Sequence, residues 1–414
     1  MSIYARDTLV IVEPFTSQPE GNEVIIGQIE TGVFLAVPVE AVELLEHLAC
    51  GQTVGEVADR YQQKYGEVPD LDDFLSLMES KGLVKPKAIG ENKSDTANAP
   101  SPKLPDRRYH FSNFPQSLAE KLFVWPVLLG SFALIAGATA TLIMNPSLAP
   151  RSRDLYFPDH RTLSATLLAL ASYFTIFLHE LAHLVAARSL GINSKIGISH
   201  RLWYLVAETD LTGLWTVPRR RRYLPLLAGV LLDLVSASLL VFLLLADTRH
   251  LLGLPTMVLR LVRALVLTYV LRVAWQFFFY IRTDFYYVLA NFFNCRNLLG
   301  DTEVLLRNQL ARFFPSMRHR DQSLIPAPER RVIRAYAVIW VGGRVLSIFL
   351  LFAVTVPVAI RYIKNLNAAF SAGYSTNRYN FFDALLLSAY FLVPLATGFS
   401  MWIGGLIRRE RTQK

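Results

Sequence analysis

The chain has 414 residues, of which 52% are hydrophobic and only 18% are charged, and its mean hydropathy is +0.32. A typical soluble domain carries about 25% charged residues. The apolar residues are concentrated from Leu122 onward, in recurring runs of about 20 residues, each long enough to cross the hydrocarbon core of a bilayer. This composition excludes a purely soluble enzyme, a disulfide-rich secreted scaffold and a disordered protein.

The charge balance is basic, with 42 lysines and arginines against 33 acidic residues, a net charge of +9. Many of the basic residues stand at the ends of apolar segments, where lipid headgroups and membrane topology explain them. The chain shows no zinc-finger, homeodomain or RNA-binding motif. We therefore expect a lipid bilayer as its partner and no nucleic acid.

Cysteines and the N-terminus suggest a cytosolic setting for the first residues. Cys50 and Cys295 are too few for a disulfide framework and form no metal-ligand pair. Met1–Gln18 contains Asp7 and Glu13 and lacks the apolar core of a cleavable signal peptide. We expect the N-terminal region to remain in the cytosol.

Residues 1–85 are patterned as a small α+β domain of the winged-helix type. Short runs rich in valine and isoleucine predict strands at Thr8–Glu13, Glu23–Gln28 and Gly32–Val37. Three helices follow, the second opening with a Thr53/Glu56 capping box and the third near Asp70, before a stop at Gly82. The apolar positions at helical spacing are Val39, Val42, Leu45 and Leu48, then Val54, Val57 and Tyr61, then Leu71, Phe74, Leu75 and Met78.

The segments "VIIGQIETGVFLAV", "ELLEHLACGQTVGEVA" and "FLSLMESKGLV" resemble the PqqD-like family, the peptide-recognition element of ribosomal peptide biosynthesis, over residues 8–85. The resemblance implies that a leader peptide adds a strand to an edge of the small sheet, held by backbone hydrogen bonds. The receptive edge would lie near Val24–Ile29, with Val24, Ile25 and Ile26 as substrate-binding residues. The alternative is a winged-helix spacer without a ligand.

A linker is expected between this domain and the membrane, over residues 86–121. Its first part, Lys85–Arg108, is rich in proline, lysine, asparagine and serine and has almost no periodicity. Such a tether would raise the local concentration of a bound peptide near the bilayer.

Residues 122–414 predict a polytopic α-helical membrane domain of about six spans. The loops Gly191–Tyr223 and Asp284–Arg331 and the tail Arg408–Lys414 are rich in arginine, which places them and both termini on the cytoplasmic side. We expect a multi-pass protein of the bacterial cytoplasmic membrane. The predicted spans are Leu122–Met144, Leu163–Leu190, Leu224–Ala246, Met257–Ile281, Val332–Ile360 and Phe382–Ile407.

The second predicted span contains an HExxH motif formed by His179, Glu180 and His183. On a helix the two histidines share one face and can bind one Zn²⁺, and the glutamate beside them is placed to act as catalytic base. Three ionisable groups in an apolar span are costly to insert, so a functional explanation is the default. The alternative, two histidines that bond to neighbouring helices, does not explain the glutamate.

A zinc site of this kind needs a third protein ligand, and Asp284 at the end of the fourth predicted span is the candidate. The alternative is a helix-end carboxylate paired with Arg282. Asn291 is a candidate for positioning the substrate backbone or for capping a helix. Asp233, in the third predicted span, is expected to form a structural ion pair with an arginine; the candidates are Arg263, Arg272 and Arg344.

The run "FLHELAHLVAARSLG", with a later aspartate at a span end, resembles the site-2 protease group of intramembrane zinc metalloproteases, of the M50 type. It is most similar to the branch of peptide zinc metalloproteases found with peptide biosynthesis and export genes. The resemblance covers about Leu163–Leu299 and implies zinc on His179, His183 and Asp284 with Glu180 as base. Phe285 and Gly229-Val230 depart from the Asp-Gly and Gly-Pro pairs usual in the group.

Together these features predict a membrane zinc metalloprotease that removes the leader of a ribosomally made precursor peptide at the cytosolic membrane face. The resemblances also imply peptide-export or modification partners. Two alternatives stay open: a non-catalytic peptide-binding component of a maturation or export complex, and a regulatory protease that cuts transmembrane segments.

Overall fold

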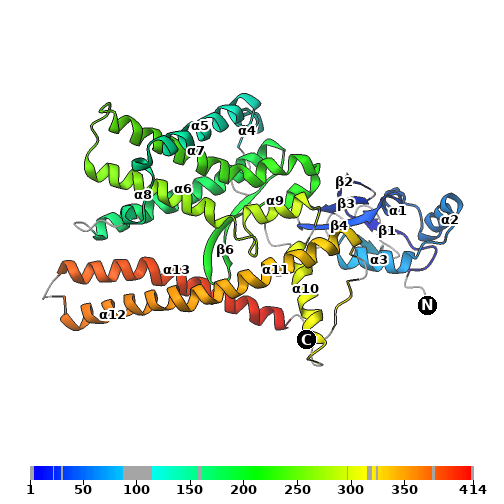
Figure 1. Ribbon diagram of the computed structural model, residues 1–414. Coiled ribbons are helices and arrows are strands. Elements are labelled where there is room, and N and C mark those ends of the chain that lie inside the picture. Colours follow the sequence, from blue (N-terminus) through cyan, green and yellow to red (C-terminus); the bar gives the residue numbers. More distant parts are fainter. Residues whose placement is uncertain are drawn as a thin grey trace. The chain divides into compact units, whose positions relative to one another are not determined.

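A computed structural model describes residues 4–21, 23–28, 31–86, 114–155, 161–295, 297–314, 319–322, 325–374 and 378–411. The chain forms two compact units. The first contains residues 1–112, 192–195 and 210–222, and the second contains residues 113–191, 196–209 and 223–414. Figure 1 shows the strands of the small N-terminal part in blue, while the rest of the chain is predominantly helical. The coarse fold class predicted from the sequence is confirmed.

The N-terminal domain matches the expected order of strands followed by three helices. All three predicted strands are present, and two further strands, β2 and β5, were not predicted. The strands β2, β3 and β4 form one antiparallel sheet, and β1 pairs with β5 in another. The elements are β1 (Val10–Val12), β2 (Thr16–Glu20), β3 (Glu23–Gln28), β4 (Val33–Pro38), α1 (Val39–Ala49), α2 (Val54–Tyr65), α3 (Leu71–Ser80) and β5 (Val84–Pro86).

Local capping explains where the helices of this domain begin and end. Thr53 and Glu56 form the predicted capping box at the start of α2, and Asp70 accepts a hydrogen bond from the backbone of Asp73 at the start of α3. Gly66 ends α2 with a left-handed backbone, φ 76°, which favours glycine. The predicted apolar faces then meet in one core, in which Ile26, Leu45, Leu75 and Met78 are fully buried.

The expected receptive edge of the sheet is wrong, because β3 is its central strand. Val24 pairs with Pro19 on one side and with Val37 on the other. Val24, Ile25 and Ile26 are buried, so a peptide cannot add to β3 without displacing a strand. The sequence did not reveal β2, which has little apolar character and contains a proline. Ile29, the end of the proposed edge, lies outside the described residues.

The segment before α7, which belongs to the first unit, packs against β2. It contains two short 3₁₀ helices, η3 (Thr212–Thr216) and η4 (Arg219–Arg221). The buried guanidinium of Arg222 pairs with Glu20 at 3.0 Å and stacks on the ring of Trp215. Arg222 is therefore not part of a solvated basic loop but a structural residue of the first unit.

The predicted linker, 86–121, lies mostly outside the described residues, which resume at 114. Its last part is helical: α4 (Gln116–Leu122) precedes the first long apolar helix.

Among the described residues, five helical segments are long and apolar enough to cross a membrane. They are Trp125–Met144, Ala165–Ser189, Arg219–Thr248, Ala327–Ala372 and Arg378–Gly405. The fourth span predicted from the sequence forms a helix, α8, but is not among them. It ends at Trp275 and carries three arginines, Arg260, Arg263 and Arg272.

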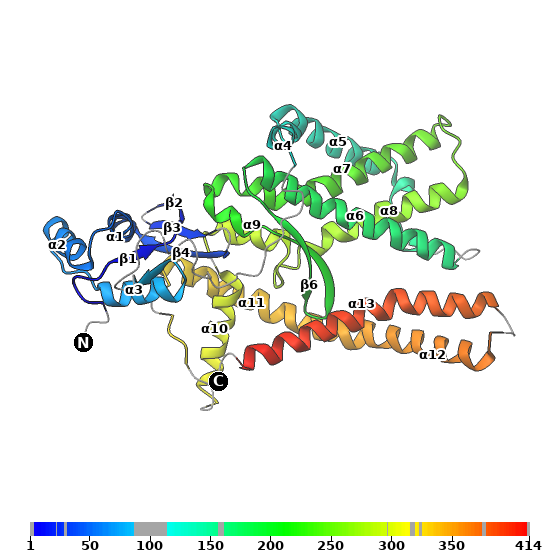
Figure 2. The same cartoon turned by 180° about the vertical axis from the view of Figure 1, so that it is seen from behind.

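Within the second unit, α7 contacts the helices α5, α6, α8 and α9. Helices α12 and α13 run side by side, which can be followed in Figures 1 and 2 in orange and red. A hairpin of β6 and β7 leads from α6 toward α7. The helices and strands are α5 (Trp125–Met144), η1 (Pro146–Leu148), η2 (Ser152–Leu155), α6 (Arg161–Ser189), β6 (Lys195–Arg201), β7 (Tyr204–Asp210), α7 (Tyr223–Thr248), α8 (Thr256–Trp275), α9 (Asp284–Phe292), α10 (Leu298–Ala311), α11 (Ala327–Leu350), a π-helical turn (Leu351–Thr355), α12 (Val356–Ala372) and α13 (Arg378–Arg411).

Candidate metal centre

Helix α6 presents the two histidines of the HExxH motif on one buried face. His179 and His183 are four residues apart, so their side chains lie one turn apart on the helix. Their Nε2 atoms are separated by 3.1 Å, and both residues are at most 4% exposed. The spacing read from the sequence therefore brings the two rings together as predicted.

Asp284 completes the cluster from a distant part of the chain. Its Oδ2 lies 3.1 Å from Nε2 of His179 and 3.3 Å from Nε2 of His183. Together these three residues form a group whose ligand atoms lie within 4.8 Å of one another, a set that could hold a metal ion. The proposed third ligand is thus at the position where the sequence argument required it.

Asp284 is held by the turn between α8 and α9. Gln276, just after α8, accepts a hydrogen bond from the Asp284 backbone at 3.0 Å through its side-chain oxygen. Thr283 caps α9 by accepting from the Tyr286 backbone and donates its hydroxyl to the carbonyl of Gln276. The turn therefore fixes the first residue of α9, and with it the carboxylate.

The outer nitrogens of both rings have acceptors, which determines the tautomers. Nδ1 of His179 lies 2.8 Å from Oδ2 of Asp233, and Nδ1 of His183 lies 2.6 Å from the carbonyl of Pro225. A carbonyl oxygen can only accept, so Nδ1 of His183 carries a proton and donates it. In a neutral ring this leaves the Nε2 lone pair unprotonated and directed at the cluster, which is how histidines in metal sites are oriented.

The cluster of inward-facing acceptors is the observation that fits a cation. Two Nε2 atoms and one carboxylate oxygen converge in the buried interior. When both Nδ1 atoms are protonated and the rings are neutral, neither Nε2 atom carries a proton, so all three atoms are acceptors. Such a group of acceptors is unfavourable in a low-dielectric interior unless a positive charge lies among them. The donor set therefore fits a bound metal ion.

Close approach of α7 requires a glycine at position 229. A Cβ placed there would lie 2.4 Å from Nε2 of His183 and 2.5 Å from Nε2 of His179. No real Cβ tolerates such distances, so the missing side chain of Gly229 provides the space beside the ligand atoms.

A charged network supports His179 from behind. Asp233 on α7 is 1% exposed and also accepts from Arg272 of α8 at 3.1 Å. Arg272 in turn donates to the hydroxyl of Thr175 on α6 at 2.6 Å. The expected ion pair of Asp233 is confirmed with Arg272, but the contact with His179 gives this carboxylate a second role that sequence reasoning missed.

Glu180 lies next to the histidines and is oriented by the hairpin. Its carboxylate accepts from the hydroxyl of Thr209 on β7 at 2.8 Å, and the same hydroxyl lies 2.9 Å from the backbone carbonyl of Glu180. Glu180 is 8% exposed. No sequence signal singled out Thr209, because a threonine in a polar loop segment is common.

Asn291 is buried on α9, two turns after Asp284, and is not part of the group of ligand atoms. Its predicted contact with a substrate stays a prediction. Two other asparagines follow α9. Asn294 has a left-handed backbone with φ 56°. Asn297 precedes α10 and makes no side-chain capping bond.

Comparisons of the chain with family models, with curated proteins and with solved structures give no match. What the protein does is therefore inferred from the geometry of the site.

Proposed function

We propose that the protein is a membrane-embedded zinc metalloprotease that cleaves a ribosomally made precursor peptide after its leader. The convergence of His179, His183 and Asp284 within 4.8 Å, with Glu180 next to His179 in the chain, carries this proposal. The site would combine three metal ligands with a fourth side chain, the carboxylate of Glu180, that is not needed to bind the metal.

The chemistry of the donors favours zinc over harder cations. Two imidazole nitrogens and one carboxylate are typical of catalytic zinc, which keeps a fourth position open, whereas magnesium and calcium prefer sites made of oxygen atoms. Zinc, when bound, would polarise the scissile carbonyl and lower the pKa of the attacking water.

Glu180 is the residue that would move protons. It would accept one from the attacking water and return it to the leaving amine, the role of a general base and then a general acid. The hydrogen bond from Thr209 holds one carboxylate oxygen, which restrains the rotamer of Glu180. The buried setting limits access of bulk water, so a bound substrate would exclude solvent other than the attacking water.

The N-terminal domain would recruit the substrate. Since β3 is central, strand addition would use an outer edge of the sheet, which is that of β2 or β4; within the described residues each of these strands pairs only with β3. Backbone hydrogen bonds along such an edge can hold an extended leader with little sequence preference. Recruitment beside the bilayer supports a role in peptide maturation in preference to cleavage of transmembrane segments in signalling.

The decisive experiment compares the wild type with Glu180→Gln in lipid, using a leader-bearing precursor and mass spectrometry to locate the cut. We expect the variant to retain zinc and to lose about 10²–10⁴-fold in cleavage rate. Glu120→Gln, at an exposed position on α4, is the matched control and should cleave normally. Unchanged cleavage by Glu180→Gln would leave only a non-catalytic role for the site.

Recruitment is tested separately with the full chain. The complete precursor and the isolated leader should both bind, and the precursor without its leader should not. Equal binding of the precursor with and without its leader would refute the proposed role of the N-terminal domain.

A further inference from the structure

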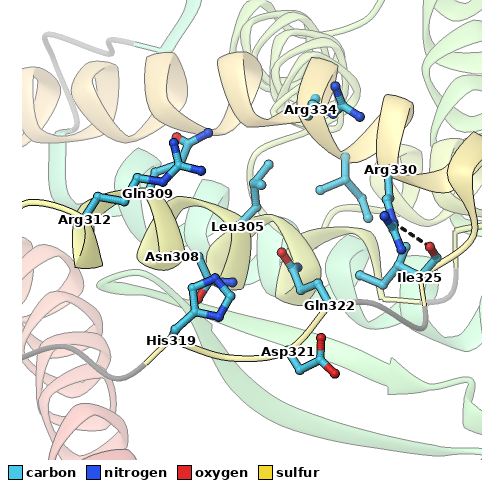
Figure 3. A pocket seen from close by; sticks show the side chains of 11 residues that line it. Leu305, Asn308, Gln309, Arg312, His319, Asp321, Gln322, Ile325, Arg330 and Arg334 are labelled. Atoms are coloured by element: carbon cyan, nitrogen blue, oxygen red, sulfur yellow. Dashed lines mark hydrogen bonds between the residues drawn. The ribbon is translucent and has the colours of Figure 1, made fainter.

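A cavity of about 500 Å³ lies apart from the candidate metal centre, between α10 and the first turns of α11. Leu305 and Ile333 supply apolar lining, and cationic and amide side chains supply the rest. Figure 3 shows Arg312 and Arg330 toward opposite ends of the cavity and His319 between them on the connecting segment. The polar lining residues are Asn308, Gln309, Arg312, His319, Asp321, Gln322, Arg330 and Arg334.

The wall of this cavity is built by specific hydrogen bonds. The side chain of Asn308 donates to the carbonyl of Arg320 at 2.8 Å and accepts from its backbone N–H at 2.9 Å, which ties the connecting segment to α10. Gln322 donates to the carbonyl of Asp301, and Arg330 donates through Nε to the carbonyl of Ile325. The cavity is therefore a shaped site and not a gap between loose side chains.

The charge of the lining selects an anion. Three arginines line the cavity against one acid, Asp321, and no ion pair engages Arg312 or Arg334 within the described part of the chain. Guanidinium groups bind phosphate oxygens in a bidentate way, and the side-chain amide of Gln309 adds a neutral donor. A phosphate group matches this lining better than a neutral ligand.

The position of the cavity identifies the source of the phosphate. Arg330 and Arg334 stand at the start of the 46-residue apolar segment Ala327–Ala372, which at 1.5 Å per residue is roughly 70 Å long and exceeds the ~30 Å hydrocarbon core. A segment of this length extends beyond the hydrocarbon region, and the arginines at its start favour a position among headgroups and water. Phe313 and Phe314, beside Arg312, are 79% and 56% exposed, and exposed phenylalanines next to a basic residue are suited to a membrane surface.

We infer that this cavity binds the headgroup of an anionic phospholipid, with its phosphate between Arg312 and Arg334 and its chains leaving along α11. Basic pockets beside the ends of spanning helices are suited to such headgroups. The lipid would anchor α10 and α11 at the membrane surface. This site is independent of the metal centre and of the proposed protease activity.

The test uses the purified, delipidated full chain and phosphatidylglycerol as the probe, with phosphatidylcholine of the same chains and inorganic phosphate as comparisons. Native mass spectrometry gives the affinities. We expect phosphatidylglycerol to bind more tightly than the other two. In Arg312→Gln/Arg334→Gln, its affinity should fall by about 25-fold, at roughly 5-fold per arginine near a membrane surface.

The matched control is Arg361→Gln/Lys364→Gln, which removes two charges from exposed positions on α12, in the same long helical segment. It should bind phosphatidylglycerol like the wild type, and circular dichroism should show both variants folded. The inference would be overturned if the two phospholipids bound equally well or if both variants lost the same affinity. Binding of inorganic phosphate as tight as that of the lipid would overturn it too. Binding of an acidic peptide in place of the lipid would also overturn it.

Discussion

Replacement of Asp233 by asparagine tests whether the network behind His179 supports metal binding. The carboxylate is almost fully buried and contacts both Nδ1 of His179 and Arg272. Asparagine keeps the size of the side chain but removes its charge, so the basicity and orientation of the histidine ring change. Substitution of such a supporting group lowers metal affinity by about 10–100-fold, which corresponds to about 1.4–2.7 kcal/mol.

The same substitution leaves the guanidinium of Arg272 without its counter-ion. Removing one partner of a buried pair costs about 3–5 kcal/mol. We expect the lower end of this range, because Arg272 keeps its bond to Thr175 and its contact with the ring of Tyr269. Asp233→Asn/Arg272→Met should therefore regain stability over the single variant without regaining zinc affinity.

The assay is competition for zinc between the purified full chain and a chelator, with the thermal midpoint measured on the same samples. Asp247→Asn is the control. Asp247 lies on the same helix, and its carboxylate accepts from the backbone of Leu254, away from the histidines. Zinc affinity in Asp233→Asn equal to that of the wild type would refute the supporting role, and equal losses in both variants would indicate a general effect on α7.

Three further outcomes are expected. Gly229→Ala should abolish zinc binding, because its Cβ would enter the space of both histidine Nε2 atoms. The control Gly130→Ala on α5 has no atom within 4 Å of the new Cβ and should retain zinc in the same chelator assay. Asp284→Asn should weaken zinc binding more than Asp233→Asn, since it removes a ligand charge and not a supporting one; the reverse order would contradict the ligand assignment. Burial and the hydrogen bond to Glu79 raise the pKa of Tyr4 from 10.0 to about 12, so the stability that Tyr4 contributes is complete below pH 10 and is lost as pH rises toward 12. Alkaline titration of tyrosinate absorbance should show one fewer late-ionising group in Tyr4→Phe than in the wild type, and an equal number in both would refute the shift.

Much of the N-terminal domain followed from local patterns. The capping box at Thr53, the cap at Asp70 and the apolar spacing of three helices are encoded within a few residues, and each was found where expected. The strand β2 was not, because a short polar strand with a proline becomes a strand only through pairing with β3. That pairing decides which strand has a free edge, so the peptide edge could not be placed from sequence.

In the membrane half, too, some features followed from local sequence and others did not. Apolar length predicted most of the spans, but α8 stops earlier than its hydropathy suggested because the chain turns at Gln276 to place Asp284. The sequence by itself determined that His179 and His183 share a face of α6, since a four-residue spacing puts two side chains on one side of a helix whatever the rest of the chain does.

Only the tertiary structure decided which residues of other helices and strands contact the HExxH motif. Thr209 on β7, and Asp233 and the carbonyl of Pro225 on α7, reach the motif from between 29 and 54 residues away along the chain. Helical periodicity describes neighbours within one helix and carries no information about which helices pack together. The convergence of α6, α7, β7 and α9 therefore turned a short motif into a buried group of side chains that could hold a metal ion, with hydrogen-bond partners around it.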